Sequence, residues 1–376
     1  MKPRDPTIIK LENAERIDRR QASTLLAEAP LLTLGDMAGQ IRLRLHPDPM
    51  VTYVVDRNIN YTNVCMSGCR FCAFYRDLDH PEAYVLSKAS LAQKIEETLK
   101  LGGTQILLQG GMHPDLSLDD HEAILRFIKN GFDIHIHGFS PPEIHYLAEK
   151  ENLTVATVIN RLKTAGLGSI PGGGAEILVN RVRRRISPRK CTADQWLDVM
   201  RIAHLQGLRT TSTMMFGHIE TPEDIIDHLL KIRTLQDETG GFTAFIPWTF
   251  QPSNTRIAVE PATSVEYLRV LALSRIVLDN IQNIQASWVT QGAKIAQVAL
   301  AFGANDLGST MIEENVVAAA GVDVMLPKEE IIRLIENAGY IARQRDCFYN
   351  DLDQESQSMD QMGQISPHGN DGEKPR

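Results

Sequence analysis

From residue 51 onward, short apolar runs rich in β-branched residues alternate with longer amphipathic segments. The runs that predict strands cover residues 52–61, 104–108, 132–137, 168–171, 209–216, 242–250, 283–288 and 304–308. The segments that predict helices cover residues 87–101, 118–130, 193–206, 222–238, 264–281 and 290–302. Such an alternation is typical of βα units around a parallel sheet. Eight strands predict a closed α/β barrel of the TIM type, and a six-stranded open barrel is the alternative because the last two runs are weak.

The chain on either side of this region has a different pattern. Residues 1–50 contain helical patterns at 21–29 and 34–45 but no strand, which predicts a helical N-terminal extension before a barrel at 51–325. Pro327 begins a predicted helix that runs to about Arg345, so we expect residues 326–349 to pack on the barrel. Residues 350–376 are rich in Gln, Ser, Gly and Asp and predict a disordered tail, because that composition buries too little apolar surface to fold alone.

Charge and length exclude several classes of partner. The chain has 39 basic and 47 acidic residues, a net charge of −8, which argues against binding to nucleic acid or to an anionic membrane. Its one basic run, Arg181 with 183–185, is explained either by a solvated helix end or by an anionic substrate. No apolar run approaches the roughly 18 residues that span a bilayer. With an odd number of cysteines and no secretion signal, we expect a cytoplasmic protein.

Three cysteines carry the strongest chemical signal. Cys65, Cys69 and Cys72 follow the first predicted strand in the spacing Cys-x3-Cys-x2-Cys, and no fourth cysteine lies near them. An iron–sulfur cube normally takes four cysteine ligands, so three leave one iron open for chemistry. A closed zinc site would need a fourth ligand, and the nearest downstream imidazole is His80. We therefore predict a [4Fe-4S] cluster bound by these three cysteines.

This spacing, with Phe71 directly before the third cysteine, resembles that of the radical S-adenosylmethionine (SAM) superfamily. The resemblance implies that SAM chelates the open iron, receives one electron and yields a 5′-deoxyadenosyl radical that removes a hydrogen atom from substrate. It also implies which residues contact SAM. The expected contacts are Gln109, Gly110 and Gly111 at the methionyl end and Gly217 and Ile219 at the adenine, and Phe71 is a further expected cofactor contact. Glu176 is a carboxylate suited to ribose hydroxyls or to proton transfer.

Each of these strand-end motifs has a structural alternative. A tight turn explains the pair Gly110-Gly111 as well as a ligand does. Glu176, at the end of the glycine run 172–174, would either face a ligand or cap the following helix. His135 and His137 alternate on one face of the third strand, where hydrogen-bonded core histidines are commoner than a second metal site.

Longer strings narrow the resemblance to one family. The strings at 109–115, 139–144, 171–177, 236–242, 245–252, 285–288, 303–309 and 313–315 are similar to those of cyclic dehypoxanthinyl futalosine synthase. The resemblance covers about residues 50–320. Aminofutalosine synthase and the deazaflavin synthase subunit that handles tyrosine share several strings. The pair Pro247-Trp248 and the run 285–288 favour the cyclase.

The family resemblance implies a step of the futalosine route to menaquinone. The substrate would be the nucleoside-derived small molecule dehypoxanthine futalosine, which loses a hydrogen from ribose C4′ and closes onto its benzoate ring. An external one-electron donor such as flavodoxin or ferredoxin would supply the electron. The residues that suit substrate contact are Trp248, Phe250, Gln285, Ser287, Asn305 and Ser309. The candidates for the base that removes the final proton are Glu220, Asp306 and His218.

Two other functions stay open at this point. A sister radical SAM enzyme would add a deoxyadenosyl or tyrosyl fragment to another acceptor. A non-enzymatic iron–sulfur carrier would bind a cluster and leave SAM intact. The carrier fits poorly, because it has no use for a glycine-lined barrel mouth and an open iron.

Overall fold

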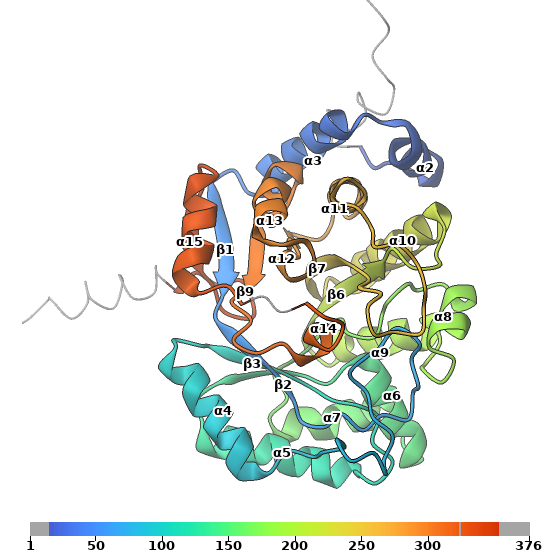
Figure 1. Cartoon of the computed structure of the whole chain (residues 1–376), viewed down its shortest axis with the longest axis vertical. Helices are drawn as coiled ribbons and strands as arrows, with labels where there is room; N and C mark the ends of the chain where they lie inside the picture. The colour runs from blue at the N-terminus through green and yellow to red at the C-terminus, as the bar shows by residue number, and fades with distance from the viewer. Residues whose placement is uncertain (1–14, 323–324, 353–376) are drawn as a thin grey trace, which may run out of the picture.

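Seven parallel strands form the main sheet of the computed structural model, which describes residues 15–322 and 325–352 (Figure 1). Their order in the sheet is their order in the chain, so every connection leads to the neighbouring strand. These strands are β2 (Asp56–Asn60), β3 (Gln105–Gln109), β4 (His135–Gly138), β5 (Ser169–Ile170), β6 (Arg209–Phe216), β7 (Phe242–Thr249) and β8 (Asn283–Ile284).

A second sheet of three parallel strands completes the ring. It contains β10 (Ile341–Gln344), β1 (Met50–Val54) and β9 (Asp306–Ser309), in that order. Only Val55 separates β1 from β2, and one bridge between Gln285 and Asp306 joins the end of β8 to β9. The predicted α/β barrel is therefore confirmed. The first predicted strand, at 52–61, is in fact two strands, since its first residues belong to β1 in the smaller sheet and the following ones to β2 in the main sheet.

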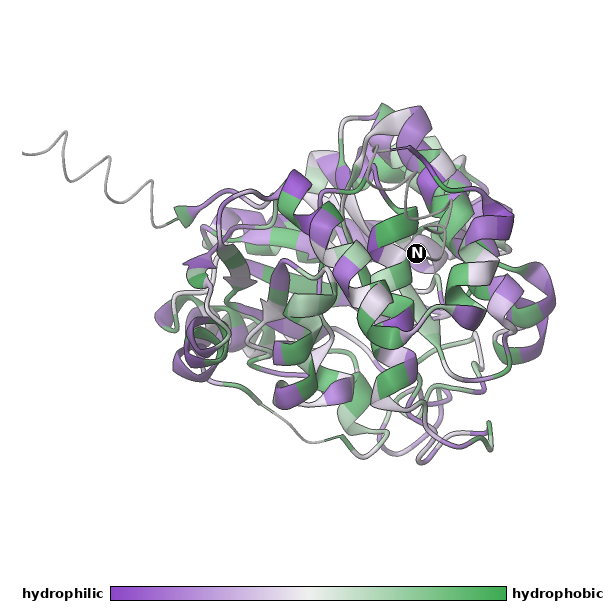
Figure 2. Cartoon of the chain, turned by 90° about the horizontal axis from the view of Figure 1, so that it is seen from above, coloured by the Kyte–Doolittle hydropathy of each residue, from purple (hydrophilic) through white to green (hydrophobic). Residues whose placement is uncertain are grey.

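Helices cover the outside of this ring. They are α4 (Lys88–Lys100), α5 (Leu118–Gly131), α6 (Pro141–Lys150), α7 (Val155–Ala165), α8 (Asn180–Ile186), α9 (Ala193–Leu205), α10 (Pro222–Thr239), α11 (Ser264–Val277) and α13 (Ala293–Ala299). The short helix α12 (Trp288–Gln291) follows β8. Hydroxyl side chains begin many of them. Ser87, Thr192 and Thr263, for example, each accept a hydrogen bond from a backbone N–H in the first turn. Figure 2 shows hydrophilic and hydrophobic residues alternating along the helices, as expected when one face packs on a sheet.

The N-terminal extension consists of α2 (Arg19–Glu28) and α3 (Leu31–Leu45), which pack against α10 and α11 (Figure 1). The Arg42 side chain, 2% exposed, ties α3 to the barrel by donating hydrogen bonds to the carbonyls of Ala304 and Met50. Met50 is the first residue of β1, and Ala304 lies just before β9. The extension therefore covers the N-terminal ends of β1 and β9, opposite the end where the cysteine loop leaves β2.

The C-terminal region differs from the sequence prediction. Helix α15 spans Lys328–Asn337 and does not continue to Arg345, because Gly339 adopts a φ of +85° and the chain then forms β10 beside β1. The predicted helix 290–302 is likewise interrupted at Gly292, which has a φ of +78°. Of the predicted tail at 350–376, residues 353–376 lie outside the described residues.

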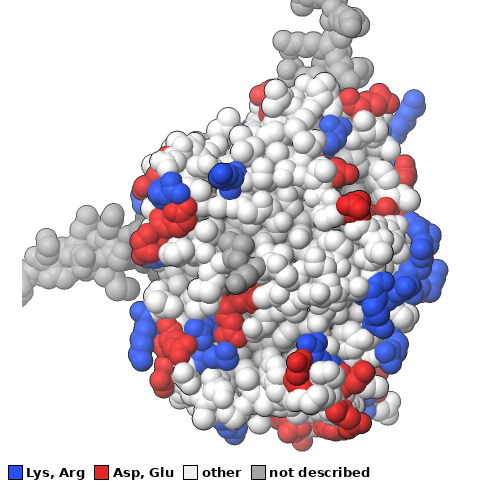
Figure 3. Space-filling view, in the orientation of Figure 1, with Lys and Arg blue, Asp and Glu red and all other residues white. Residues whose placement is uncertain are grey.

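The surface carries both signs of charge. Figure 3 shows acidic and basic side chains interspersed over one face, with basic side chains gathered at the right edge, where Figure 1 places α8. Arg183 of α8 is not part of that surface, because it is 2% exposed and donates to the carbonyls of Gly174, Ala175 and Cys191. No helix within residues 15–322 and 325–352 has the length and apolar character to cross a membrane.

Candidate active site

A cavity of about 400 Å³ lies inside the barrel, within the size range of small-molecule sites. Residues of the cysteine loop, which follows the C-terminal end of β2, line it. Arg345, Cys347 and Tyr349, which follow β10, line it as well. Of the predicted site residues, those that line the cavity are Cys65, Cys69, Phe71, Cys72, Gln109, Gly110, Gly111, Glu176, Trp248, Gln285, Ser287 and Ser309. Those that do not line it are Gly217, His218, Ile219, Glu220, Phe250, Asn305 and Asp306.

The three cysteines share one loop and one wall of the cavity. The Ser67 hydroxyl lies 2.9 Å from the Cys65 sulfur and 3.3 Å from the Cys69 sulfur, and the Met112 N–H donates to Cys65 Sγ at 3.4 Å. Within the described ranges, no three ligand side chains converge as a single metal ion would require. A cubane cluster instead takes each thiolate on a separate iron and gains from hydrogen bonds to sulfur, so this loop fits that group.

The pair Gly110-Gly111 brings two loops into contact. A Cβ on Gly111 would lie 2.0 Å from the Val64 carbonyl oxygen, and one on Gly110 would lie 2.5 Å from the Tyr61 ring. Glu143, buried in α6, holds this turn by accepting from the Gly110 N–H at 3.0 Å and the Tyr61 hydroxyl at 2.8 Å. The glycines are therefore required where the loop after β3 packs on the cysteine loop.

Glu176 ends the glycine run and faces the cavity from a strained position. Its φ is +41°, and its side chain is 5% exposed. Lys190 Nζ lies 2.9 Å from Glu176 Oε1, and an Arg183 nitrogen lies 3.4 Å from Oε2. Lys190 also lies 5.0 Å from the centre of the Phe71 ring. Two cations thus hold this carboxylate, Arg183 from the barrel wall and Lys190 from the cavity lining.

The predicted substrate residues separate into two groups. Trp248 and Gln285 line the cavity, as do Ser287 and Ser309. Phe250 is 1% exposed and packs edge to face on His218, with ring centres 6.1 Å apart. Asn305 is 3% exposed, and Arg275 donates to its Oδ1 at 2.7 Å. These contacts place Phe250 and Asn305 in the protein core, where they support neighbouring loops.

Two of the three predicted bases lie in the turn between β6 and α10. His218 Nδ1 is 2.8 Å from Glu220 Oε2, and the N–H groups of Gly217 and His218 also donate to that carboxylate. Burial alone would raise the pKa of Glu220, but the hydrogen bond and charge of His218, with these N–H groups, lower it to about 2. A carboxylate with so low a pKa is a weak base. The geometry therefore favours a structural role for this turn.

Asp306 is also committed to structural partners. It is 0% exposed, and its carboxylate accepts from Arg345, from the Gly308 N–H at 2.8 Å and from the Thr52 hydroxyl. Arg345 follows β10, whose pairing with β1 was not predicted. Asp306 was a candidate base in the sequence because the local residues do not reveal its ion pair with Arg345, which lies far along the chain.

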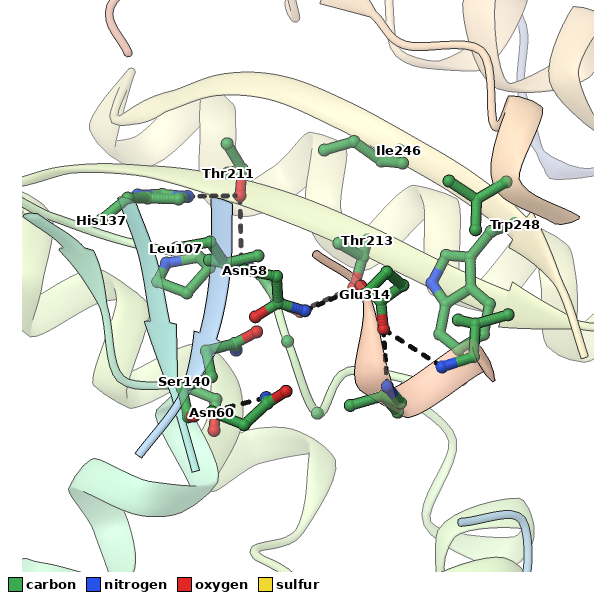
Figure 4. A pocket seen from close by; sticks show the side chains of 18 of the residues that line it. Asn58, Asn60, Leu107, His137, Ser140, Thr211, Thr213, Ile246, Trp248 and Glu314 are labelled. Carbon is green, nitrogen blue, oxygen red and sulfur yellow. Dashed lines mark hydrogen bonds between the residues drawn. The ribbon is translucent and has the colours of Figure 1, made fainter. Parts of the chain in front are cut away.

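Several cavity residues were missed in the sequence. Asp56, Asn58 and Asn60 alternate along β2 and all line the cavity, together with Gln105 and Glu314. Figure 4 shows Asn58, Asn60 and Glu314 around the cavity. The available signal was the polar residue at every second position of a predicted strand, since alternate residues share one face. A polar face is unusual inside a barrel, where apolar side chains dominate.

The histidines of β4 have the properties of core histidines. Ser169 Oγ lies 2.7 Å from His135 Nε2 and 2.6 Å from His137 Nδ1. Burial lowers the pKa of His137 to about 3, so its imidazole is neutral at pH 7. Its other nitrogen faces Thr211 across the cavity wall at 3.5 Å (Figure 4).

Solved structures with the same fold are distant in sequence. The FeFe-hydrogenase maturase HydG from Carboxydothermus hydrogenoformans aligns with a TM-score of 0.73 at 16% identity, over 91% of this chain and 79% of HydG. Methylornithine synthase (PylB) aligns with a TM-score of 0.69 at 16% identity, over 93% of this chain and 99% of PylB. These likenesses establish the barrel fold alone.

Sequence relatives are much closer. Cyclic dehypoxanthine futalosine synthase of Halalkalibacterium halodurans is 45% identical, over 92% of this chain and 94% of the relative. The corresponding protein of Streptomyces coelicolor is 42% identical over 92% and 88%. The 5-amino-6-(D-ribitylamino)uracil–L-tyrosine 4-hydroxyphenyl transferase of Methanopyrus kandleri is 44% identical over 80% and 84%.

Two family models cover most of the chain. The radical SAM superfamily model matches residues 59–232, which include the cysteine loop. The model of the CofH/MqnC C-terminal region matches residues 239–358, which include Trp248, Gln285 and the 306–315 segment. The relatives named above are similar over 84–94% of their own length. The chain is therefore an enzyme of the radical SAM superfamily and belongs, within it, to the CofH/MqnC family.

Proposed function

We propose that this enzyme closes dehypoxanthine futalosine into its cyclic, spiro-fused product in menaquinone biosynthesis. The observation that carries the proposal is the similarity to cyclic dehypoxanthine futalosine synthases over 92% of the chain. In this reaction the ribose C4′ loses a hydrogen atom, and C4′ then forms a bond to the benzoate ring. Loss of one proton and one electron restores the aromatic ring, so the product is two hydrogens lighter than the substrate.

The residues that would hold the cofactors lie at the C-terminal ends of the strands. Cys65, Cys69 and Cys72 would bind the [4Fe-4S] cluster, and 109–111 with Glu176 would hold SAM beside it. When bound, SAM supplies a 5′-deoxyadenosyl radical, the hydrogen-abstracting group of this superfamily. The barrel wall would keep water and stray hydrogen donors from the reacting carbon. We expect the electron to come from a cytoplasmic carrier such as flavodoxin or ferredoxin.

Two carboxylates of the cavity lining are better placed as proton acceptors than Glu220 or Asp306. Asp56 and Glu314 both line the cavity. Burial raises the pKa of Asp56, which suits a general base better than a strongly acidic group does. We propose that one of these two carboxylates accepts the final proton.

A second candidate function is transfer of a 4-hydroxyphenyl group from tyrosine, the activity in the name of the Methanopyrus kandleri relative. Reconstituted, reduced enzyme should therefore be incubated anaerobically with SAM and either dehypoxanthine futalosine or the tyrosine and ribitylaminouracil pair. Free 5′-deoxyadenosine and a product two hydrogens lighter, detected by mass spectrometry, support the cyclase. Consumption of tyrosine with unchanged dehypoxanthine futalosine contradicts it, and Cys69→Ala serves as the inactive control.

A further inference from the structure

Two amide side chains in the cavity wall each have a bound nitrogen and an unbound oxygen. Asn58 Nδ2 donates to Glu314 Oε2 at 2.7 Å, and Gln105 Nε2 donates to Asp56 Oδ2 at 2.7 Å. The oxygens Asn58 Oδ1 and Gln105 Oε1 are buried and have no hydrogen-bond partner. Both side chains are 5% exposed, and both line the cavity. Buried carbonyl oxygens without a partner are rare and disfavoured, so a donor from a ligand is expected at this wall.

The carboxylates fix the orientation of each amide, because each carboxylate accepts from the amide nitrogen. Glu314 is held in turn by the N–H groups of Val316 and Val317, at 2.8 and 3.1 Å, and the Ser309 hydroxyl donates to Asp56. A rotated Asn58 amide would set its oxygen against the Glu314 carboxylate, and two acceptors repel each other. Figure 4 shows the Asn58 nitrogen turned toward Glu314. The Asn58 oxygen is therefore free to accept a hydrogen bond from a ligand.

The amide pair lies deeper in the barrel than the expected SAM contacts. Asn58 pairs with Leu107 in the β2–β3 register, and Gln105 pairs with Asp56 one layer closer to the N-terminal end. Asn60 and Gln109 form the layer above, next to the loops that carry the cysteines and Gly110. Since a strand rises about 3.3 Å per residue, each layer is roughly 7 Å deep. The two amides thus lie at the depth of the part of the cavity below the predicted cofactor.

We propose that Asn58 and Gln105 form a subsite that accepts hydrogen bonds from sugar hydroxyls of the substrate. The inference deepens the proposed function and rests on it, because the ribose of dehypoxanthine futalosine supplies those hydroxyls. Besides the proton-acceptor role proposed for one of them, Glu314 and Asp56 orient the two amides. An ammonium group, as in tyrosine, could also donate hydrogen bonds to these two amide oxygens.

Binding measurements with deoxy analogues test the subsite. Dissociation constants are measured anaerobically, on cluster-loaded enzyme with SAM, for dehypoxanthine futalosine, its monodeoxyribose analogues and L-tyrosine. Wild-type enzyme should bind at least one deoxy analogue on the order of tenfold more weakly than the substrate, the typical effect of one hydrogen bond. Asn58→Ala should bind the substrate more weakly by a similar factor and no longer discriminate against that analogue.

Asn60→Ala is the matched control. Asn60 lies on the same strand and face, but its oxygen accepts from Asn315 at 3.2 Å and its nitrogen donates to the Gln109 carbonyl at 3.4 Å. Its replacement should leave the discrimination between hydroxyl and deoxy ligands as in wild type. Gln105→Met, which keeps the size of the side chain and removes the acceptor, is the second test variant if Asn58→Ala does not load iron.

The outcomes separate the inference from the proposed function. If Asn58→Ala and Gln105→Met both still bind the deoxy analogue more weakly than the substrate, and the wild type forms the cyclic product, the subsite is overturned and the cyclase proposal stands. Tight L-tyrosine binding that these substitutions weaken assigns the amides to an ammonium group and overturns the sugar assignment. A wild-type enzyme that neither binds nor converts dehypoxanthine futalosine overturns both the subsite and the cyclase.

Discussion

Arg345 and Asp306 form a two-point ion pair inside the barrel, with Nε 2.6 Å from Oδ2 and Nη2 3.1 Å from Oδ1. Asp306 begins β9 and Arg345 follows β10, and these two strands flank β1 on opposite sides. The pair therefore ties together the three strands that complete the ring. Arg345 also lines the cavity, so the same contact shapes the cavity wall.

Replacing Asp306 should destabilise the fold. Asp306→Ala leaves the buried Arg345 guanidinium without its counter-charge, and breaking such a pair lowers the free energy of unfolding by about 3–5 kcal/mol. Urea denaturation followed by circular dichroism measures the change. Glu330→Gln, which breaks an exposed pair with Arg333, is the control and should leave the midpoint unchanged. If Asp306→Ala is as stable as wild type but no longer forms the cyclic product, Asp306 is again a candidate for the base.

Glu220→Gln should lower stability far more than turnover. The Glu220 pKa is depressed to about 2 in the folded protein, below its ordinary value of 4.5. Its stabilising effect is therefore complete above about pH 5 and is lost as the pH falls toward 2. The difference in unfolding free energy between wild type and Glu220→Gln should shrink over that window. Cyclisation slowed more than about a hundredfold, with an intact cluster and a folded variant, would instead identify Glu220 as a proton-transfer group.

Cys69→Ala should prevent cluster assembly. Removing one of three thiolates leaves two for a cluster that already lacks a fourth cysteine, so iron content and the cluster absorbance band after reconstitution should both be lost. Cys191→Ala is the matched control, because Cys191 is equally buried but does not line the cavity. It should retain iron. A normal absorbance band in Cys69→Ala contradicts the assigned ligand set.

Gly111→Ala should disturb the cysteine loop. The added Cβ would lie 2.0 Å from the Val64 carbonyl oxygen, a distance that requires the backbone to move. We expect slower cluster assembly and a lower melting temperature. Gly131→Ala, at the end of α5, introduces a Cβ with no atom within 4 Å and should leave both unchanged. Equal behaviour of the two variants would show that the close packing at Gly111 is unimportant.

Trp248→Leu should weaken substrate binding, since an aromatic contact contributes about 0.5–1.5 kcal/mol beyond its buried area. The corresponding rise in KM is roughly two- to tenfold. Phe250→Leu is the comparison, because Phe250 is buried beside His218 and does not reach the cavity. It should lower the melting temperature and leave KM unchanged. The reverse pattern would exchange the roles of the two aromatic residues.

Local sequence patterns determined most of the architecture. Hydrophobic periodicity and capping residues are local properties, so the alternation of strands and helices could be predicted, including β6 at residues 209–216. The cysteine spacing is local as well, and it predicted three candidate ligands, which lie on the loop after β2. The same holds for the glycine run that ends at Glu176, which lines the cavity as a strand-end loop of a barrel should.

The tertiary structure decided the partners of the polar side chains. Asp306 and Glu220 were plausible bases in sequence, but one is paired with a residue 39 positions away and the other is held by its own turn. The polar face of β2 is a candidate subsite only because the fold brings Glu314 into hydrogen-bonding contact with Asn58. Whether a carboxylate is reactive or structural depends on burial and on hydrogen-bond donors from distant segments. Those interactions arise only when the ring of strands closes, so no local pattern contains them.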